Sequence, residues 1–368
     1  MFHVKHPLSF LDDALADLAR AGLLRQRRAP VDLARSFCSN DYLGLASEIS
    51  PAGAAGAGAS RLIAGERDEH LALELEVAAW LKAPAALAFT SGYAANVGAI
   101  AALAGAGDRI VSDALNHASI VDGARLSRAE VVVTPHLDVE AVERALALPC
   151  RGRQWVVTES YFSMDADAPD LRSLRRACDA ANAALYVDEA HALGVLGPGG
   201  RGLAAEQEVT PDITVGTFGK AFGAGGAFVA GSDSLVRWLW NRARSFVFST
   251  GLSPQLAAAA RLNVARAQGD PSLAARTLQN ASRLRDGLAA IGIVPLGFGH
   301  IVPWLEADTG RALALSAALA ERGQHVLAVR PPTVPTSRLR LAVTAAHGDH
   351  DIDALLRAVA ECVACLPR

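Results

Sequence analysis

Residues 184–191 read ALYVDEAH, a short apolar run that ends in two acidic residues and a histidine. A continuous run of this kind, without polar alternation, is typical of a strand that is buried on both faces of a parallel sheet. Five more runs of similar length also end near polar residues: 86–90, 109–112, 131–134, 155–159 and 213–217. Helical patterns separate several of them. The sequence therefore predicts an α/β fold with a mostly parallel sheet.

The pattern changes after about residue 251. Long helical patterns at 256–268, 272–291 and 310–323 surround short strands at 301–305, 325–329 and 338–343, which predicts a smaller α+β domain. An amphipathic helix is expected over 8–28. Since 368 residues exceed one ordinary domain, we predict three parts: an N-terminal helix and arm (1–38), a large cofactor-binding domain (39–255) and a small C-terminal domain (256–368).

The composition argues against nucleic acid and membrane partners. Lys and Arg number 35 against 38 Asp and Glu, so there is no basic excess that would bind a phosphate backbone. Residues 83–107 carry no charge, but they are rich in Ala and Gly, which favours a buried strand and helix over a membrane span. The first ten residues contain no apolar run of the kind found in signal peptides. We expect a protein that acts on small molecules.

The five cysteines indicate free thiols in a reducing cytoplasm. Cys362 and Cys365 form a C-x-x-C motif within an amphipathic helical pattern that begins near Asp351. Because no second cysteine pair completes a zinc site, we expect two ordinary buried thiols there and no metal.

Lys220 has an unusual setting in the stretch TFGKAFGAGG, residues 217–226. A lysine among aromatic residues and glycines can lose its water, and a desolvated lysine has a lowered pKa that suits Schiff-base chemistry. An ordinary surface lysine in a glycine-rich loop is about equally compatible with this stretch alone. A Walker A loop is excluded, because Thr214 stands where its first glycine is required and Ala221 follows the lysine.

Asp188, Glu189, Ala190 and His191 allow three interpretations. Their letters match a helicase box, but the chain has no Walker A loop to hold the nucleotide. In the second interpretation Asp188 and His191 share a metal, but no third ligand is evident. In the third interpretation, Asp188 pairs with the cationic ring nitrogen of pyridoxal phosphate. Asp188 precedes Lys220 by one helix–strand unit, and ligands of open α/β sheets bind beyond the carboxyl ends of the strands.

Two further stretches could complete such a site. Residues 90–93, Thr-Ser-Gly-Tyr, lie between a predicted strand and a helix, where free N–H groups bind phosphate and Ser91 could add a hydroxyl. A simple helix N-cap would also explain Ser91. His117 follows the run 109–112. It is either an ordinary histidine or a flat ring stacked on a cofactor.

Taken in order, these motifs resemble the α-oxoamine synthase family of fold-type I pyridoxal-phosphate enzymes, over essentially the whole chain. The matching stretches are SNDYLGL (39–45), TSGYAAN (90–96), HAS (117–119), 159–165, 188–191 and 217–220. The resemblance implies an aspartate-aminotransferase-like large domain with a mostly parallel seven-stranded sheet and a smaller C-terminal domain. It also implies pyridoxal 5′-phosphate as cofactor and a homodimer with sites at the interface.

The resemblance assigns a role to each matching residue. Lys220 would carry the cofactor as an imine and move the substrate α-proton, Asp188 would pair with the ring nitrogen, and His191 would bind the ring hydroxyl. His117 would stack on the ring and orient the substrate. The other implied cofactor contacts are Ser91, Gly92, Tyr93, Ser163 and Thr217, with Ser249 and Thr250 from the neighbouring subunit. The implied substrate contacts are Arg25, Thr333 and Arg340, of which Arg340 would clamp the amino-acid carboxylate.

The stretch AVRPPTVP, residues 328–335, narrows the resemblance. It is similar to members that join L-alanine to a pimeloyl thioester, on CoA or acyl carrier protein, with release of carbon dioxide in biotin biosynthesis. The alternative is a sister enzyme such as glycine C-acetyltransferase. Three segments near the acyl-side entrance are shorter than the family pattern, and Glu66 stands where the family often has an aromatic residue. These departures concern the acyl donor.

Overall fold

The structure is a computed structural model that describes residues 8, 10–24, 31–47 and 54–366. The chain divides into two compact units, residues 1–33 and 34–368, which are described separately. The first contains α1 (Phe10–Arg20), where Leu11, Leu15 and Leu18 repeat at helical spacing and are exposed. This confirms a helix within the predicted range 8–28, although residues 25–30 lie outside the described part of the chain. A 3-10 turn, η1 (Leu33–Arg35), spans the division.

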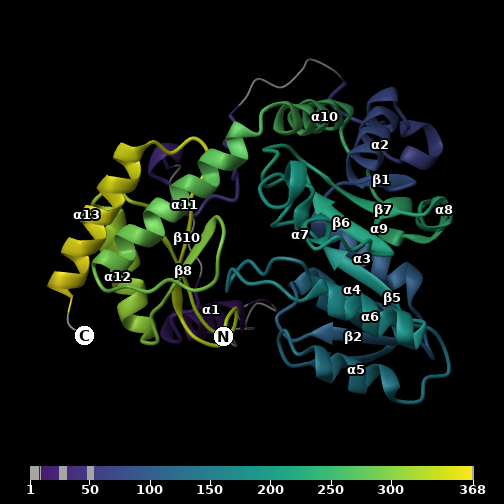
Figure 1. Ribbon diagram of the computed structural model, residues 1–368, viewed down its shortest axis with the longest axis horizontal. Helices are drawn as coiled ribbons and strands as arrows, with labels where there is room; N and C mark the ends of the chain where they lie inside the picture. Colours follow the sequence, from purple (N-terminus) through teal and green to yellow (C-terminus); the bar gives the residue numbers. More distant parts are fainter. Residues whose placement is uncertain (1–7, 9, 25–30, 48–53, 367–368) are drawn as a thin grey trace, which may run out of the picture. The chain divides into compact units, whose positions relative to one another are not determined.

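The second unit contains the predicted mostly parallel sheet (Figure 1). Within the described residues it has seven strands in the order β1-β7-β6-β5-β4-β2-β3. Their bounds are β1 (Ala85–Phe89), β2 (Arg109–Asp113), β3 (Glu130–Thr134), β4 (Gln154–Glu159), β5 (Ala184–Asp188), β6 (Ile213–Thr217) and β7 (Ala227–Gly231). All pairings are parallel except those of β7, which is antiparallel to β1 and β6. Six of the strands confirm the six apolar runs to within one residue.

The strand that the runs did not reveal is β7. It begins directly after the glycine-rich residues 223–226, and its own sequence, AFVAG, contains a further glycine. Because β7 is antiparallel to β6, the two need no crossover helix between them. The connection is therefore a loop, and Lys220 lies in it.

Helices cover both faces of the sheet, as expected for strands that are buried on both sides. In β5, Tyr186 packs on the face covered by α3, α4, α8 and α9, whereas Leu185 and Val187 pack on the other face with α5, α6 and α7. On that second face α2 and α10 pack over β1 and β7. The helices are η2 (Arg61–Gly65, a π-helix), α2 (Asp68–Leu81), α3 (Gly92–Leu103), α4 (Ala118–Ser127), α5 (Val139–Ala147), α6 (Leu171–Ala181), η3 (Pro198–Gly200), α7 (Gly202–Glu206), α8 (Asp233–Arg242), α9 (Arg244–Val247) and α10 (Pro254–Gly269).

Local sequence determines where several helices begin. The side chains of Asp138, Asp170, Ser232 and Asp308 each accept a hydrogen bond from a backbone N–H three residues ahead. An N-cap of this kind stabilises a helix by about 1 kcal/mol. The caps therefore place the starts of α5, α6, α8 and, in the C-terminal part, α12 (Thr309–Glu321).

The C-terminal part confirms the predicted α+β pattern. A three-stranded antiparallel sheet, in the order β8-β10-β9, packs against three helices through a shared apolar core (Figure 1). The elements are α11 (Ser272–Ala290), β8 (Ile301–Leu305), α12 (Thr309–Glu321), β9 (Leu327–Val329), β10 (Arg338–Ala342) and α13 (Asp349–Cys365).

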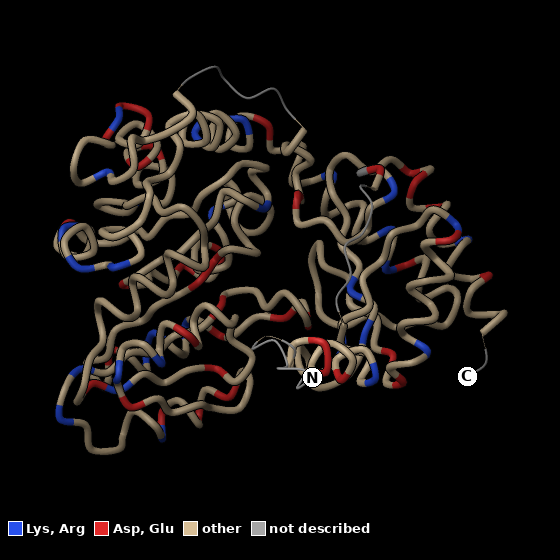
Figure 2. Tube along the Cα trace, turned by 180° about the vertical axis from the view of Figure 1, so that it is seen from behind, with Lys and Arg blue, Asp and Glu red and all other residues tan. Residues whose placement is uncertain are grey.

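The helices test two predictions, namely that Cys362 and Cys365 are buried thiols and that the chain has no membrane span. Cys362 is buried in the core, but Cys365 is exposed, so the prediction of two buried thiols is wrong for Cys365. It occupies the last turn of α13 and, unlike Cys362, does not belong to the apolar core beneath that helix. Among the described helices none is long and apolar enough to cross a bilayer. Along the described trace, acidic and basic residues are interspersed (Figure 2).

A buried ion cluster joins η2 to α2. The Arg61 side chain is 1% exposed and lies 2.7 Å from a carboxylate oxygen of both Glu66 and Glu74. Glu74 also accepts the backbone N–H of Ala88 in β1, at 2.7 Å. The Arg61 guanidinium lies 5.4 Å from the ring centroid of Trp240. Glu66, which departs from the family pattern, is thus the second counter-ion of a buried cation.

Replacing Arg61 with leucine is expected to lower the free energy of unfolding by about 3–5 kcal/mol, because Glu74 would remain buried without its counter-ion. Equilibrium urea unfolding measures the change. The matched control is Arg125→Leu, which removes an exposed arginine 3.8 Å from Asp122 and should cost at most about 1 kcal/mol. Equal losses in the two variants would contradict a special role for the buried cluster.

Candidate active site

The polar ends of neighbouring strands meet at one edge of the large sheet. Glu159 ends β4 and Asp188 ends β5, and the two residues are paired in the register of these parallel strands. Thr217 ends β6, the next strand in the sheet. The carboxyl ends of parallel strands form the usual ligand site of open α/β folds. The structure therefore places three polar side chains where the sequence predicted a site.

Lys220 lies in a tight turn just beyond β6. Its carbonyl accepts the N–H of Gly223 at 2.9 Å, and the flanking Phe218 and Phe222 are fully buried. Gly223 has a φ of +56°, and a Cβ there would lie 2.3 Å from the backbone N of Ala46, so glycine is required. Burial lowers the pKa of the Lys220 amine, although Asp188 and Glu159 act in the opposite direction. Such an amine is suited to attack a carbonyl group.

Two N–H groups hold the Asp188 carboxylate in place. Oδ1 accepts the backbone N–H of Ala190 at 2.9 Å, and Oδ2 accepts the Asn96 side-chain amide at 2.7 Å. The carboxylate is close enough to the Lys220 amine to act on the pKa of that amine, which it raises. Asp188 therefore has a defined direction at the strand end.

His191 is a neutral ring at the same edge. Its Nδ1 lies 2.7 Å from the Tyr42 hydroxyl, within a fully buried environment. Burial, together with the charges of Lys220 and Arg340, lowers the pKa of His191 well below its usual value. A neutral imidazole keeps one N–H to donate.

His117 begins α4 and is held from two directions. Its backbone N–H donates to Glu159 Oε1 at 2.7 Å, and its Nδ1 accepts the backbone N–H of Ser119 at 3.2 Å. Burial and the nearby Lys220 lower the pKa of the His117 ring. Because Nδ1 is an acceptor, the ring proton belongs on Nε2.

Arg340 reaches the site from β10 of the small sheet. Its Nε donates to the Ser163 carbonyl at 2.7 Å, and Nη2 donates to Asn40 Oδ1 at 3.1 Å. Within the described part of the chain, Nη1 makes no hydrogen bond. The guanidinium influences the charge of both Lys220 and His191, so it belongs to the same cluster.

The N-terminus of α3 lies beside the end of β6. A Cβ built on Gly92 would lie 3.8 Å from Thr217 Cβ, so the two segments are direct neighbours. Ser91 is the N-cap, and its Oγ accepts the N–H of Ala94 at 3.1 Å. The Thr217 hydroxyl donates to the Gly226 carbonyl at 3.0 Å. Tyr93, half exposed, donates to Asp122. The first-turn N–H groups of this twelve-residue helix suit an anion such as phosphate.

Three predicted site residues are not brought into this cluster, and a fourth is not among the described residues. Ser249 donates to the Thr250 carbonyl at 3.1 Å, and Thr250 is exposed. Among the described residues, neither forms a hydrogen bond with Lys220 or Asp188. Thr333 is exposed in the turn between β9 and β10. Arg25 lies outside the described residues. The roles of these four stay predictions.

The structure adds residues for which the motifs suggested no role. Asn40, Tyr42, Asn96 and Ser119 all lie inside the matching stretches and all bind a predicted site residue. Glu159, buried at the end of β4, binds His117, and burial and Asp188 raise the pKa of its carboxyl group. For Asn96 and Glu159, the available signal was a polar side chain within or at the end of an otherwise apolar or small-residue stretch.

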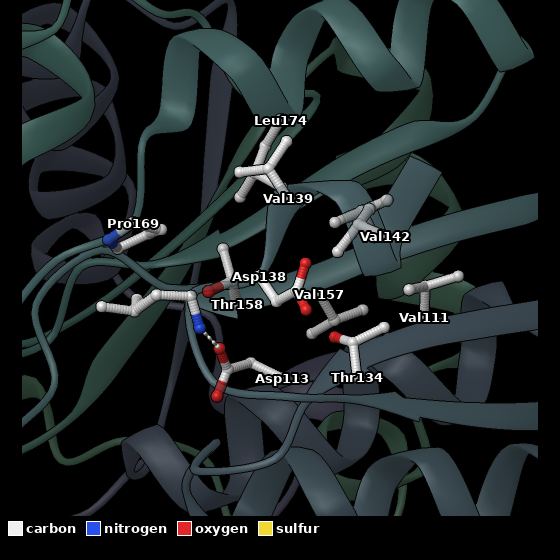
Figure 3. Close-up of a pocket in the computed structure, with 12 residues that line it drawn as sticks. Val111, Asp113, Thr134, Asp138, Val139, Val142, Val157, Thr158, Pro169 and Leu174 are labelled. Atoms are coloured by element: carbon white, nitrogen blue, oxygen red, sulfur yellow. Dashed lines mark hydrogen bonds between the residues drawn. The ribbon is translucent and has the colours of Figure 1, made fainter. Parts of the chain in front are cut away.

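A third histidine ties three loops together at this edge of the sheet. His136 Nδ1 lies 2.9 Å from Asp113 Oδ1, and its Nε2 lies 3.1 Å from Asp167 Oδ2. Asp113 also accepts the backbone N–H of Leu137, beside a narrow apolar cavity (Figure 3). Although burial disfavours a charged ring, the hydrogen bonds to the two carboxylates raise the pKa of His136 to about 10. The imidazolium thus holds the loop that carries Ser163.

Because His136 lies between two carboxylates, we predict that the folded protein loses stability in alkali. Its pKa in the folded chain lies above the unfolded value of 6.5, so its contribution is complete below pH 6.5 and disappears as the pH rises toward about 10. We expect a loss on the order of 2 kcal/mol across that interval, since the ring is partly exposed. Urea unfolding at several pH values measures it. His136→Gln should flatten this slope; an unchanged slope would assign it to other groups.

Comparisons with known proteins agree with this geometry. The family model "Aminotransferase class I and II" matches residues 35–359. An 8-amino-7-oxononanoate synthase from Anaeromyxobacter dehalogenans (strain 2CP-1 / ATCC BAA-258) is 49% identical over 90% of this chain and 87% of its own length. A variant of serine palmitoyltransferase from S. paucimobilis, solved with bound PLP and myriocin, superposes with a TM-score of 0.87 at 27% identity, covering 96% of each chain. An 8-amino-7-oxononanoate synthase from Francisella tularensis gives a TM-score of 0.77 at 27% identity, covering 89% of this chain and 97% of that one.

Proposed function

Because this chain belongs to the 8-amino-7-oxononanoate synthase family, among the class I and II aminotransferases, we propose that it joins L-alanine to a pimeloyl thioester. The products are 8-amino-7-oxononanoate, carbon dioxide and the free thiol carrier, and the reaction serves biotin biosynthesis. The observation that carries the proposal is the pairing of an amine with lowered pKa, Lys220, with a fixed carboxylate, Asp188, at adjacent strand ends.

Pyridoxal 5′-phosphate is the cofactor of this family. When bound, it supplies an electron-withdrawing ring that stabilises negative charge on the substrate α-carbon. The residues present suit its three recognition needs. Lys220 offers the amine for its carbonyl group, Asp188 the carboxylate for its ring nitrogen, and the first turn of α3 with Thr217 the site for its phosphate. His191 and His117 would contact the ring.

The remaining groups act on the substrate. An amine whose pKa is lowered toward neutrality can take and return a proton, so Lys220 would move the α-proton of L-alanine. Arg340 would hold the carboxylate of the amino acid, because a guanidinium binds a carboxylate with two parallel hydrogen bonds. Its position beside Lys220 and His191 supports that role. The His117 Nε2–H would donate a hydrogen bond to the substrate.

The choice of substrates is tested by direct comparison. Protein loaded with pyridoxal phosphate is given L-alanine with pimeloyl-CoA or with pimeloyl carrier protein, and mass spectrometry follows 8-amino-7-oxononanoate. We expect product from L-alanine with at least one donor, matched by release of carbon dioxide. Glycine with acetyl-CoA should give no product. Turnover with that pair alone would overturn the proposal in favour of a glycine-specific sister enzyme.

We further propose that the protein is a homodimer whose partner supplies Ser249 and Thr250 to the cofactor phosphate. Ile63 and Phe248 are 86% and 72% exposed. Their two segments are direct neighbours, because a Cβ built on Gly251 would clash with the side chain of Arg61. Exposed large apolar side chains of this kind favour a protein interface. Sedimentation equilibrium tests it; a monomeric mass with full activity would overturn it. The five free thiols support a cytoplasmic location.

A further inference from the structure

Asn96 stands between two site residues that come from different elements. It lies in α3 and is 1% exposed. Its amide nitrogen donates to Asp188 Oδ2 at 2.7 Å and to Ser119 Oγ at 3.0 Å. Its amide oxygen accepts the Tyr186 hydroxyl at 2.8 Å. Both amide hydrogens and the amide oxygen of this buried side chain therefore have a hydrogen-bond partner.

These contacts permit only one orientation of the amide. Burial raises the pKa of the Tyr186 hydroxyl well above its usual value, so the hydroxyl remains a donor and faces the amide oxygen. In the reversed orientation, the amide oxygen would face the Asp188 carboxylate, and neither Asp188 nor Ser119 would receive a hydrogen bond from the amide. Tyr186 thus orients Asn96, and Asn96 in turn orients its two other partners.

The connection continues from Ser119 to His117. Since Ser119 Oγ accepts from Asn96, its own hydroxyl proton is available to His117 Nδ1, which lies 2.8 Å away. The backbone N–H of Ser119 points to the same nitrogen at 3.2 Å. Three consecutive hydrogen bonds therefore run from the Asp188 carboxylate through Asn96 and Ser119 to the His117 ring.

We propose that Asn96 is a positioning residue that fixes the Asp188 carboxylate and the His117 ring relative to each other and, through Ser119, keeps the ring proton on Nε2. The roles of Asp188 and His117 toward the cofactor rest on the proposed function. The arrangement itself does not. A ring that stacks on the cofactor and a carboxylate that binds its edge must keep one mutual geometry, and a shared rigid link supplies it.

The test compares cofactor affinity and ring spectroscopy in the full-length protein. In Asn96→Ala, we expect the dissociation constant of pyridoxal phosphate, measured by absorbance titration, to rise about tenfold or more, because Asp188 loses a charged hydrogen bond. In protein labelled with ¹⁵N-histidine, the His117 ring nitrogens should shift from one Nε2–H form to a mixture. The His117 resonances are identified with a His117→Gln variant.

A matched control separates positioning from general destabilisation. Asn280 is also a buried asparagine that donates twice, at 3.0 and 2.9 Å, but to carbonyls of Thr344 and His347 in the small sheet region. Asn280→Ala should lower the melting temperature while leaving cofactor affinity and the His117 resonances unchanged. Equal changes in both variants would overturn the proposal, as would wild-type cofactor affinity and an unchanged His117 ring in Asn96→Ala.

A second variant keeps the inference testable if Asn96→Ala does not fold. Ser119→Ala leaves the bond between Asn96 and Asp188 intact and removes only the hydroxyl that reaches His117. We expect the His117 Nδ1 resonance to move while cofactor affinity changes by less than about threefold. An unmoved resonance would overturn the link. Because neither readout uses L-alanine or a thioester, failure of the proposed reaction would be seen separately.

Discussion

Replacing Lys220 with alanine is expected to abolish turnover while the fold stays intact. The amine is the nucleophile and the proton carrier of the proposed reaction, and no other lysine can take its place. The chain contains lysine only at positions 5, 82 and 220. We expect the rate of product formation to fall by a factor on the order of 10³ or more. Steady-state kinetics measures the loss, and circular dichroism checks the fold.

Lys82 supplies the matched control for Lys220. It is an exposed lysine at the C-cap of α2, before β1, whereas the phosphate-binding stretch follows β1, and Lys82→Ala should keep full activity. Borohydride reduction in the presence of pyridoxal phosphate gives an independent readout. Peptide mapping should find the cofactor fixed to the peptide that contains Lys220 in the wild type, and none fixed at that site in Lys220→Ala. Undiminished turnover in Lys220→Ala would rule out the proposed chemistry altogether.

The second large effect is expected for Asp188→Ala. Without this carboxylate the ring nitrogen of the cofactor has no partner that favours its charged form, so negative charge on the substrate α-carbon is poorly stabilised. We expect kcat to fall by about 10²–10⁴-fold, together with weaker cofactor binding. Turnover kinetics and absorbance titration with pyridoxal phosphate measure the two changes.

Two further variants locate the cause of the Asp188 effect. Asp188→Asn keeps the shape of the side chain but removes its charge, and it should lose nearly as much kcat as Asp188→Ala. Asp212→Asn removes a carboxylate that forms an ion pair with Arg175 before β6, outside the active-site cluster, and should leave kcat unchanged. If Asp188→Asn retained wild-type kcat, the charge of Asp188 would have no part in the reaction.

The two predictions distinguish different failures. Loss of activity in Lys220→Ala alone fits any enzyme with a nucleophilic lysine. Loss in both variants, with no cofactor fixed at position 220 in the first and weaker cofactor binding in the second, fits an amine and a carboxylate that bind opposite ends of one aromatic aldehyde. The amino-acid and thioester comparison then tests the substrates, which neither variant identifies.

Much of the fold follows from local features of the sequence. Six strands were predicted from continuous apolar runs, because a strand covered by helices on both faces needs no polar alternation. The long helices of the C-terminal part were predicted from their period. The strand β7 was not predicted, because the glycine-rich residues before it resemble a loop. Only its antiparallel pairing with β1 and β6 makes it a strand. Which strands pair with each other cannot be read from the residues of one strand alone.

The candidate site divides in a similar way. Lys220, Asp188, His117 and His191 were predicted because each reactive residue sits at a strand end or in a turn of distinctive composition. Their supporting residues were not. Asn96 binds Asp188 across 92 positions, and Arg340 binds Asn40 across 300. Nothing in either neighbourhood reveals the other partner.

The sequence by itself therefore determined where the buried strands run and which family the chain resembles, and it predicted which residues would carry the chemistry. These are properties of residue type and short-range spacing, which act through local backbone preferences and burial. Only the tertiary structure decided how the reactive groups are held: the Asn96 link, the Arg61 cluster, the bracketed His136 and the reach of Arg340 from the small sheet. The physical reason is that hydrogen bonds and ion pairs need contact within about 3 Å. Such contact depends on strand order and packing rather than on distance along the chain.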